Sequence, residues 1–403
     1  MTSNLVALAR SRCCTGKPPQ TVVADGLRGF APGLGDCPMA ARTTNPLLTW
    51  TTLAPPLALV ALVLAWGRDL GALPVVVVAA ALAAAVLAAV HHAEVVAHRV
   101  GEPFGSLVLA VAVTIIEVAL IVTLMISGGK DSTSLARDTV FAAVMITCNG
   151  IVGLSLFVGA RRYKLISFNA EGTGAALATV TTLAAMTLVV PTFTTGETGP
   201  EFTPSQLAFA AVISLILYGM FVSTQTVRHR DFFLPVGKQG EPLADEHANP
   251  PSDRATWSSL GLLLVSLVAV VGLAKVESPA IESAVAAAGF PQSFVGVVIA
   301  LLVLLPETLA AVRAAQRNRI QISLNLALGS AMASIGLTIP AIAVAMVWLD
   351  GPLLLGLGPT QMVLLGLTVL VSVLTVVPGR ATRLQGGVHL VLLAAFVFLA
   401  INP

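Results

Sequence analysis

Charged residues are scarce in this chain. Only 10% of its 403 residues are Asp, Glu, Lys or Arg, whereas soluble domains carry about 25%, so an ordinary soluble fold is excluded. Aromatic residues are few as well, with two tyrosines and four tryptophans. Because the basic residues form no stripe with interleaved aromatics, nucleic acid is not an expected partner.

Motifs of metal sites and of common enzymes are also missing. The four cysteines, Cys13, Cys14, Cys37 and Cys148, show neither C-x-x-C nor Cys/His spacing, so we expect incidental thiols. No H-E-x-x-H, G-x-S-x-G or Walker sequence occurs, and these are the usual signatures of metalloproteases, serine hydrolases and nucleotide hydrolases. We therefore expect neither an enzyme nor a cofactor.

What the chain has instead is long apolar runs. Apolar residues make up 56% of it and its mean hydropathy is +0.90. Runs of about 20 apolar residues are long enough to cross a bilayer as helices, so we predict an all-α membrane protein with about 11 spans. The predicted spans are 47–66, 72–92, 104–127, 139–160, 173–192, 205–225, 257–274, 291–312, 322–348, 354–377 and 386–401.

The distribution of basic residues predicts the orientation of these spans, because Lys and Arg gather in cytoplasmic loops. With the N-terminus inside, all but four of the 22 Lys and Arg residues fall on the cytoplasmic side. The four exceptions are Arg68, Lys130, Arg137 and Lys275. We therefore predict a cytoplasmic N-terminus and an external C-terminus.

The polar segments divide the chain into parts. Residues 1–45 lack helical periodicity and predict a disordered cytoplasmic extension, and 46–69 hold one extra span. The proline-rich polar stretch 228–256 predicts a cytoplasmic linker between 70–227 and 257–403. Each of these halves has five predicted spans, and an odd number inverts the second half relative to the first, as in many secondary transporters.

Two glutamates lie within apolar runs. Glu117 is the only ionisable residue of 104–126, and Glu307 is the only one of 294–312. A carboxylate at bilayer depth costs roughly 2.5–3.5 kcal/mol, so such residues usually face a cavity where ions or protons move. Burial disfavours the charged carboxylate and a bound cation favours it, so protons and cations compete for such a pair. If the pair opens to one side of the membrane at a time, this competition becomes exchange.

Nearby polar residues are candidates for further oxygen ligands. Thr114 lies three residues before Glu117 on the same helix face, and Asn149 lies in the middle of the next span. Ser330 and Ser334 belong to an i, i+4 series that continues to Thr338. Such a series beside glycines is also typical of close helix packing, and both readings stay open.

A second polar cluster ends the second predicted span. His91, Glu94 and His98 share one helix face. The spacing permits a metal or pH-sensing site, but it is equally typical of a solvated helix end with local pairs, which we favour.

Two long segments resemble a known family. HAEVVAHRVGEPFGSLVLAVAVTIIEVALI at 92–121 and LPETLAAVRAAQRNRIQISLNLALGSAMASIGLTIP at 305–340 are similar to the signature regions of ChaA-type bacterial cation/proton antiporters of the calcium/cation antiporter superfamily. The resemblance extends through 149–162. It implies inverted five-helix repeats, Glu117 and Glu307 as the ion-binding acids, and export of Na⁺, Ca²⁺ and K⁺ in exchange for H⁺ across the bacterial inner membrane.

The resemblance has departures that bear on the cation. Calcium/proton exchangers of the superfamily have Asn three positions before each acid, where this chain has Thr114 and Leu304. Since Ca²⁺ takes six to eight oxygen ligands, a site with fewer side-chain oxygens favours Na⁺ or K⁺ over Ca²⁺.

We expect metal cations and protons as substrates and the lipid bilayer as surroundings. The alternatives are an intramembrane enzyme that uses the buried glutamates, which would turn over lipid or peptide, and a cation channel, which would show no proton-coupled saturable flux.

Overall fold

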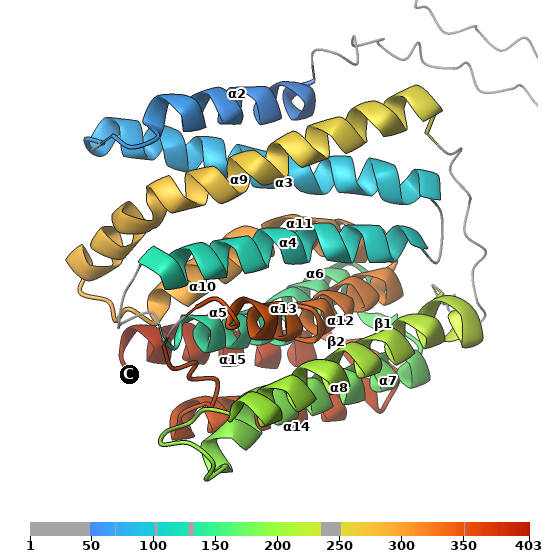
Figure 1. Cartoon of the computed structure of the whole chain (residues 1–403). Helices are drawn as coiled ribbons and strands as arrows, with labels where there is room; N and C mark the ends of the chain where they lie inside the picture. Colours follow the sequence, from blue (N-terminus) through green and yellow to red (C-terminus); the bar gives the residue numbers. More distant parts are fainter. Residues whose placement is uncertain (1–48, 69, 101–103, 128–132, 235–250, 350) are drawn as a thin grey trace, which may run out of the picture. The chain divides into compact units, whose positions relative to one another are not determined.

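The computed structural model describes residues 49–68, 70–100, 104–127, 133–234, 251–349 and 351–403. The predicted extension 1–45 and most of the predicted linker 228–256 lie outside these residues. Almost all of the described chain is helical (Figure 1). The elements in the first half are α2 (Trp50–Ala65), α3 (Ala72–Val100), α4 (Phe104–Ser127), α5 (Leu135–Met145), η3 (Ile146–Ile151), α6 (Val152–Tyr163), β1 (Leu165–Ser167), α7 (Ala170–Ala184), η4 (Ala185–Val189), η5 (Val190–Phe193), α8 (Pro204–Ser223), η6 (Thr224–Arg228) and η7 (Arg230–Phe233).

The second half has fewer and longer elements. They are α9 (Asp253–Ala287), α10 (Phe294–Val303), α11 (Leu305–Gln316), α12 (Ile320–Gly336), α13 (Thr338–Ala345), α14 (Pro359–Val376), β2 (Arg380–Thr382) and α15 (Arg383–Ile401).

Within the described residues, eight helices are long and apolar enough to cross a membrane, and the bent pair α10 and α11 forms a ninth candidate. Two shorter apolar helices, Trp50–Ala65 and Val111–Thr123, fall within the spans predicted at 47–66 and 104–127. A multi-pass helical membrane protein is thus confirmed, whereas the count of eleven spans and the repeat layout stay predictions.

Two hydrophobic clusters hold the helices together. One combines α2, α3 and α9 with parts of α4 and α10, and Figure 1 shows α2, α3 and α9 side by side. The other joins α5 to α8 with α11 to α15. Residues of α4 belong to both clusters: Ile116 and Leu120 pack in the first, and Ile121 packs in the second. The helix that carries Glu117 therefore lies where the two clusters meet.

The two most buried spans both have an interruption in their helix. In Leu135–Tyr163, 89% of the most apolar 18-residue window is buried, and in Ile320–Ala345 67% is, against 17–44% for the other six long spans. The first contains the π-helical turn η3, and the second changes from α12 to α13 at Leu337. Irregular backbone is tolerated at membrane depth only inside protein or beside a cavity, and the buried positions of these two interruptions agree with that.

A proline produces the sharpest bend. Pro306 lacks an amide hydrogen and its ring clashes with the preceding turn, and α10 and α11 meet at 54° just before it. The bend makes Glu307 part of the first turn of α11. A helix N-terminus favours negative charge, so this geometry stabilises a carboxylate at that position.

Several helix ends with basic residues lie together. Arg99 at the end of α3 forms an ion pair with Asp253 at the start of α9, and Arg162 Nη1 donates to Gln316 O at 3.3 Å. Nearby, β1 pairs antiparallel with β2, with Leu165 opposite Thr382. These contacts connect helix ends that the sequence assigns to one side of the membrane.

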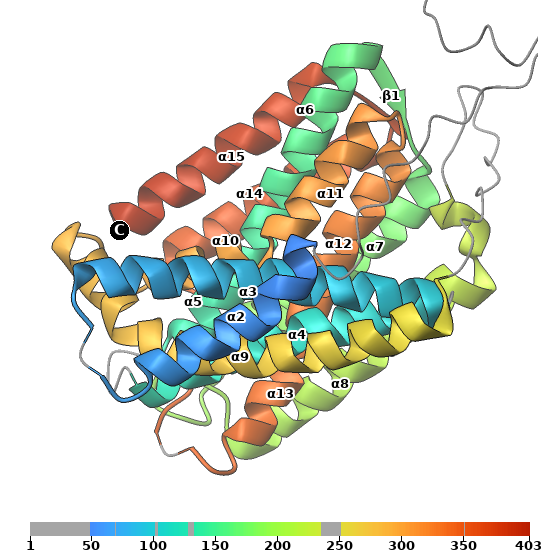
Figure 2. The same ribbon diagram turned by 90° about the horizontal axis from the view of Figure 1, so that it is seen from above.

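Close packing of α15 on α6 depends on a glycine (Figure 2). A Cβ at Gly386 would lie 2.5 Å from Phe157 N and 2.9 Å from Gly153 O, whereas a Cβ at Gly387 would meet nothing within 4 Å.

We expect Gly386→Ala to lower the free energy of unfolding by about 1–3 kcal/mol, because the two backbones must separate. The matched variant Gly387→Ala should be neutral or stabilising, since Ala favours helix. Thermal unfolding of the detergent-solubilised variants tests this; equal melting temperatures would contradict the packing.

Candidate functional site

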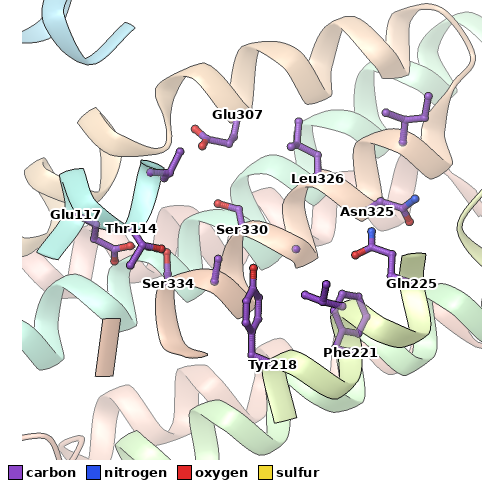
Figure 3. Close-up of a pocket in the computed structure, with 15 residues that line it drawn as sticks. Thr114, Glu117, Tyr218, Phe221, Gln225, Glu307, Asn325, Leu326, Ser330 and Ser334 are labelled. Atoms are coloured by element: carbon purple, nitrogen blue, oxygen red, sulfur yellow. Dashed lines mark hydrogen bonds between the residues drawn. The ribbon is translucent and has the colours of Figure 1, made fainter. Parts of the chain in front are cut away.

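A cavity of about 260 Å³ lies between α4, α8, α11 and α12 (Figure 3). Its walls combine apolar side chains with a small set of polar ones. The polar lining residues are Thr114, Glu117, Tyr218, Gln225, Glu307, Asn325, Ser330 and Ser334.

Both sequence-predicted glutamates lie in this cavity. Glu117 is 3% exposed and Glu307 is 6% exposed. Glu117 Oε2 accepts a hydrogen bond from Ser334 Oγ at 2.9 Å, while Glu117 Oε1 and Glu307 Oε2 have no hydrogen-bond partner among the described residues. No described Lys, Arg or His forms an ion pair with either carboxylate. Buried polar atoms normally have partners, so two unpaired carboxylate oxygens in one cavity indicate a ligand site.

Three predicted hydroxyl residues join them. Thr114 lies one helical turn before Glu117 on α4, and Ser330 and Ser334 lie one turn apart on α12. The structure therefore brings five of the six predicted site residues together: Glu117, Glu307, Thr114, Ser330 and Ser334. The packing interpretation of the α12 series also has support at Gly336, where a Cβ would lie 2.9 Å from Tyr218 Cβ.

Asn149, the sixth predicted site residue, does not line the cavity. It is fully buried in η3, where its Nδ2 donates to Thr368 Oγ1 at 2.9 Å and its Oδ1 is 3.1 Å from His389 Nδ1. His389 Nε2 is in turn 3.2 Å from Thr375 Oγ1. This network joins η3 to α14 and α15, so Asn149 lies outside the cavity in this structure.

Sequence reasoning missed three polar residues of the lining: Tyr218, Gln225 and Asn325. Both polar atoms of the Asn325 side chain already have hydrogen-bond partners. Its Nδ2 donates to Phe233 O at 2.6 Å, and its Oδ1 accepts from Gln321 Nε2 at 2.8 Å. The only signal in the sequence was that each is a polar or amphipathic residue near an apolar run, and many such residues merely face a membrane interface.

The structure does not bring His91, Glu94 and His98 together as a set of metal ligands. No group of three His, Cys, Asp or Glu residues with metal-binding geometry occurs in the described part of the chain, and both His91 and His98 are exposed. The favoured interpretation, a solvated helix end, agrees with this. The neighbouring His92 is buried instead, where its ring contacts Thr51 O at 2.9 Å and Ser259 Oγ at 3.2 Å.

The cavity has the chemistry of a cation site. It offers two carboxylates and several neutral oxygens, with no described basic group to neutralise the acids. Oxygen ligands of this kind suit Na⁺, K⁺ and Ca²⁺. Within a helical membrane protein, such a cavity is a candidate site for a transported cation.

Comparison with known proteins assigns the family. The model of the sodium/calcium exchanger protein family matches residues 70–227 and 258–402, and the chain belongs to this family. It is 48% identical over 316 residues to the putative ionic transporter y4hA of Sinorhizobium fredii, covering 78% of this chain and 85% of that protein. It is 34% identical to the sodium-potassium/proton antiporter ChaA of Escherichia coli, covering 85% of this chain and 93% of that protein.

Among solved structures, native YfkE superposes with a TM-score of 0.64. That match covers 88% of this chain and 99% of YfkE at 18% identity, and it shows the shared fold. The family and its relatives are antiporters rather than enzymes, so cation antiport across a membrane is the class of activity and the enzyme alternative is excluded.

The two possible roles of Asn149 make different predictions. Asn149→Ala should lower the free energy of unfolding by about 1–3 kcal/mol, because it leaves His389 and Thr368 with unmet hydrogen bonds. It should leave the concentration of cation that gives half-maximal exchange unchanged, because Asn149 lies outside the cavity. Thermal unfolding and vesicle flux assays measure the two quantities; a large rise in that concentration with unchanged stability would instead make Asn149 a ligand.

Proposed function

We propose that this protein exchanges cytoplasmic Na⁺, K⁺ or Ca²⁺ for external protons at the site formed by Glu117 and Glu307. The observation that carries the proposal is the meeting of two buried carboxylates, each with an unpaired oxygen, in one cavity. The antiport of sodium and potassium against protons named for ChaA supports it. Only ions are carried, and the mechanism requires no cofactor.

Competition between protons and a cation drives the exchange. With both carboxylates protonated, the cavity is neutral and holds no cation. When a cation enters, it favours the charged carboxylates and the protons leave, because metal binding to such groups releases protons. Ser334 assists by donating to Glu117 Oε2, which favours the charged form of that carboxylate.

The residues at the end of the cavity bear on which side of the membrane it opens to. Beyond the carboxylates the lining continues to Gln225 and Ile322, which lie close in sequence to Arg228 and Arg319. The positive-inside rule assigns these arginines to the cytoplasm. We therefore propose that this conformation exchanges ions with the cytoplasm, with the N-terminus inside, the C-terminus outside and the protein in the bacterial inner membrane.

Alternating access requires two related halves. We propose that 70–227 and 257–403 are inverted repeats, each contributing one acid, and that 46–69 is an additional helix. The two separate matches to one family model, at 70–227 and 258–402, support this division. Two inverted halves around a fixed site are the usual build for exposing the site to each side in turn.

The neutral oxygens bear on which cation is preferred. Thr114, Ser330 and Ser334 each add one hydroxyl oxygen to the cavity, while Leu304, three positions before Glu307, adds no side-chain oxygen. A shell of six to eight oxygens for Ca²⁺ is harder to complete here. Na⁺ or K⁺ is therefore the preferred substrate of this proposal.

Removal of either negative charge tests the proposed site. Glu117→Gln and Glu307→Gln should each lower cation/proton exchange by about 100-fold, because loss of one member of a desolvated charge interaction costs roughly 2–5 kcal/mol. The measurement is the dequenching of a pH dye trapped in vesicles with an imposed pH gradient, on addition of NaCl, KCl or CaCl₂.

Glu277 provides the matched control for these variants. It is also buried in a candidate span, at 2% exposure, and its Oε1 is likewise unpaired among the described residues, but it does not line the cavity. Glu277→Gln should retain exchange. Near wild-type exchange in Glu117→Gln or Glu307→Gln would refute the proposed site, and equal losses in all three variants would indicate a general structural effect.

The pH dependence has a defined sign. Protons occupy the carboxylates at low pH, so the half-saturating cation concentration should rise as pH falls, by up to about tenfold per pH unit for one competing proton. At high pH, where the carboxylates are already charged, this concentration should become constant. Initial exchange rates over a series of cation concentrations and pH values measure this, and a half-saturating concentration independent of pH would contradict the competition.

A further inference from the structure

Tyr218 has a hydroxyl group that the proposed site does not yet use. The residue lies on α8, on the opposite side of the cavity from α4 and α11, and its side chain is 8% exposed. Figure 3 shows its hydroxyl pointing into the cavity toward the region of Ser330 and Ser334. It is one of only two tyrosines in the chain.

The position of the ring is determined by close packing against α12. A Cβ at Gly336 would lie 2.9 Å from Tyr218 Cβ and 3.3 Å from its Cγ, so only the absence of a side chain at Gly336 lets the two helices approach this closely. The ring belongs to the main hydrophobic cluster. Because a tyrosine ring has few rotatable bonds and this one is packed, its hydroxyl is held at a fixed place in the cavity.

The hydroxyl lacks a protein partner. No hydrogen bond links Tyr218 Oη to any described residue. A tyrosine hydroxyl inside a protein usually finds such a partner, and this one faces the open space of the cavity, where water or an ion can supply it. The two glutamates line the same cavity, so a cation held there is the partner to consider.

The wall of α8 is otherwise poor in oxygen. Its other lining residues are Phe221 and Val222, and the next polar group is the amide of Gln225 in η6. The lining thus has side-chain oxygens on α4, α11 and α12, whereas the Tyr218 hydroxyl is the one oxygen that the lining side chains of α8 provide.

We propose, on the basis of the proposed function, that Tyr218 Oη is an oxygen ligand of the transported cation and contributes to the choice among Na⁺, K⁺ and Ca²⁺. A packed phenol supplies a neutral oxygen at a fixed distance from the opposite wall. This oxygen can take the place of one water in the hydration shell of a bound cation. The replacement is most favourable for the cation whose radius matches that distance. Removal of the oxygen therefore weakens binding of that cation more than binding of the others.

The chain offers a matched pair of variants for the test. Tyr218→Phe and Tyr163→Phe each remove one phenolic oxygen and keep the ring. Tyr163 lies at the end of α6, where its hydroxyl donates to Gln316 O at 3.2 Å at an exposed site, and it does not line the cavity. In vesicles, Tyr218→Phe should raise the half-saturating concentration of the preferred cation about tenfold, the range expected for one contact to a charged partner. The ratio of the half-saturating concentrations of different cations should change in Tyr218→Phe. Tyr163→Phe should have the half-saturating concentrations of the wild type.

Thermal unfolding in detergent gives a readout that does not depend on transport. Without added cation, Tyr218→Phe should melt at or above the wild-type temperature, because the hydroxyl has no protein partner to lose. A ligand that binds the folded state raises the melting temperature, so the preferred chloride salt, compared with choline chloride at equal ionic strength, should stabilise the wild type more than Tyr218→Phe.

The outcomes separate this inference from the proposed function. If the wild type exchanges cations and Tyr218→Phe shows unchanged half-saturating concentrations and cation ratios, the role of Tyr218 is refuted while the two-glutamate site stands. If the wild type shows no exchange with any of the three salts, the proposed function fails. The cation-dependent shifts in melting temperature then test whether Tyr218 is still a ligand of a bound cation. Equal cation-dependent stabilisation of the wild type and Tyr218→Phe, or none in either, then refutes the role of Tyr218 as a ligand.

Discussion

Two buried carboxylates without a basic partner are the constraint on which the rest of the structure depends. Glu117 and Glu307 lie almost fully buried in a protein whose outer surface is apolar. An unpaired charge is costly at bilayer depth, so the surrounding helices must supply hydroxyl groups, a helix N-terminus and a cavity that admits ions or protons. Ser334, the first turn of α11 and the space between α4, α8, α11 and α12 meet these needs.

Two breaks in helices lie beside the buried carboxylates. The bend at Pro306 gives α11 a new N-terminus at Glu307, and the break after Gly336 follows the hydroxyls of α12. Both breaks lie in protein rather than lipid, where unpaired backbone groups are tolerated. The site consequently combines side-chain charge with the positive end of a helix.

Glu117 lies on the helix where the two hydrophobic clusters meet. Helices α2, α3 and α9 form one cluster, and His92 adds contacts to Thr51 O and Ser259 within it. The Asn149, His389 and Thr368 network stiffens the other cluster from inside. Glu117 is therefore held by packing on both sides, within the one compact unit to which the described residues from 49 onward belong.

The sequence by itself determined the class of protein, the main spans and the two acids, because hydropathy is a local property and a carboxylate in an apolar run is costly unless it faces a cavity or a partner. It did not show which polar residues of the spans meet at one cavity. Asn149 and Ser334 are equally unusual in apolar spans, yet only tertiary packing directs Asn149 toward His389 and Ser334 toward Glu117. Tyr218 was hidden for the same reason: its place in the cavity depends on how closely α8 approaches Gly336. Which polar side chains converge is decided by helix rotation and contact distance, and neither follows from the order of residues along one span.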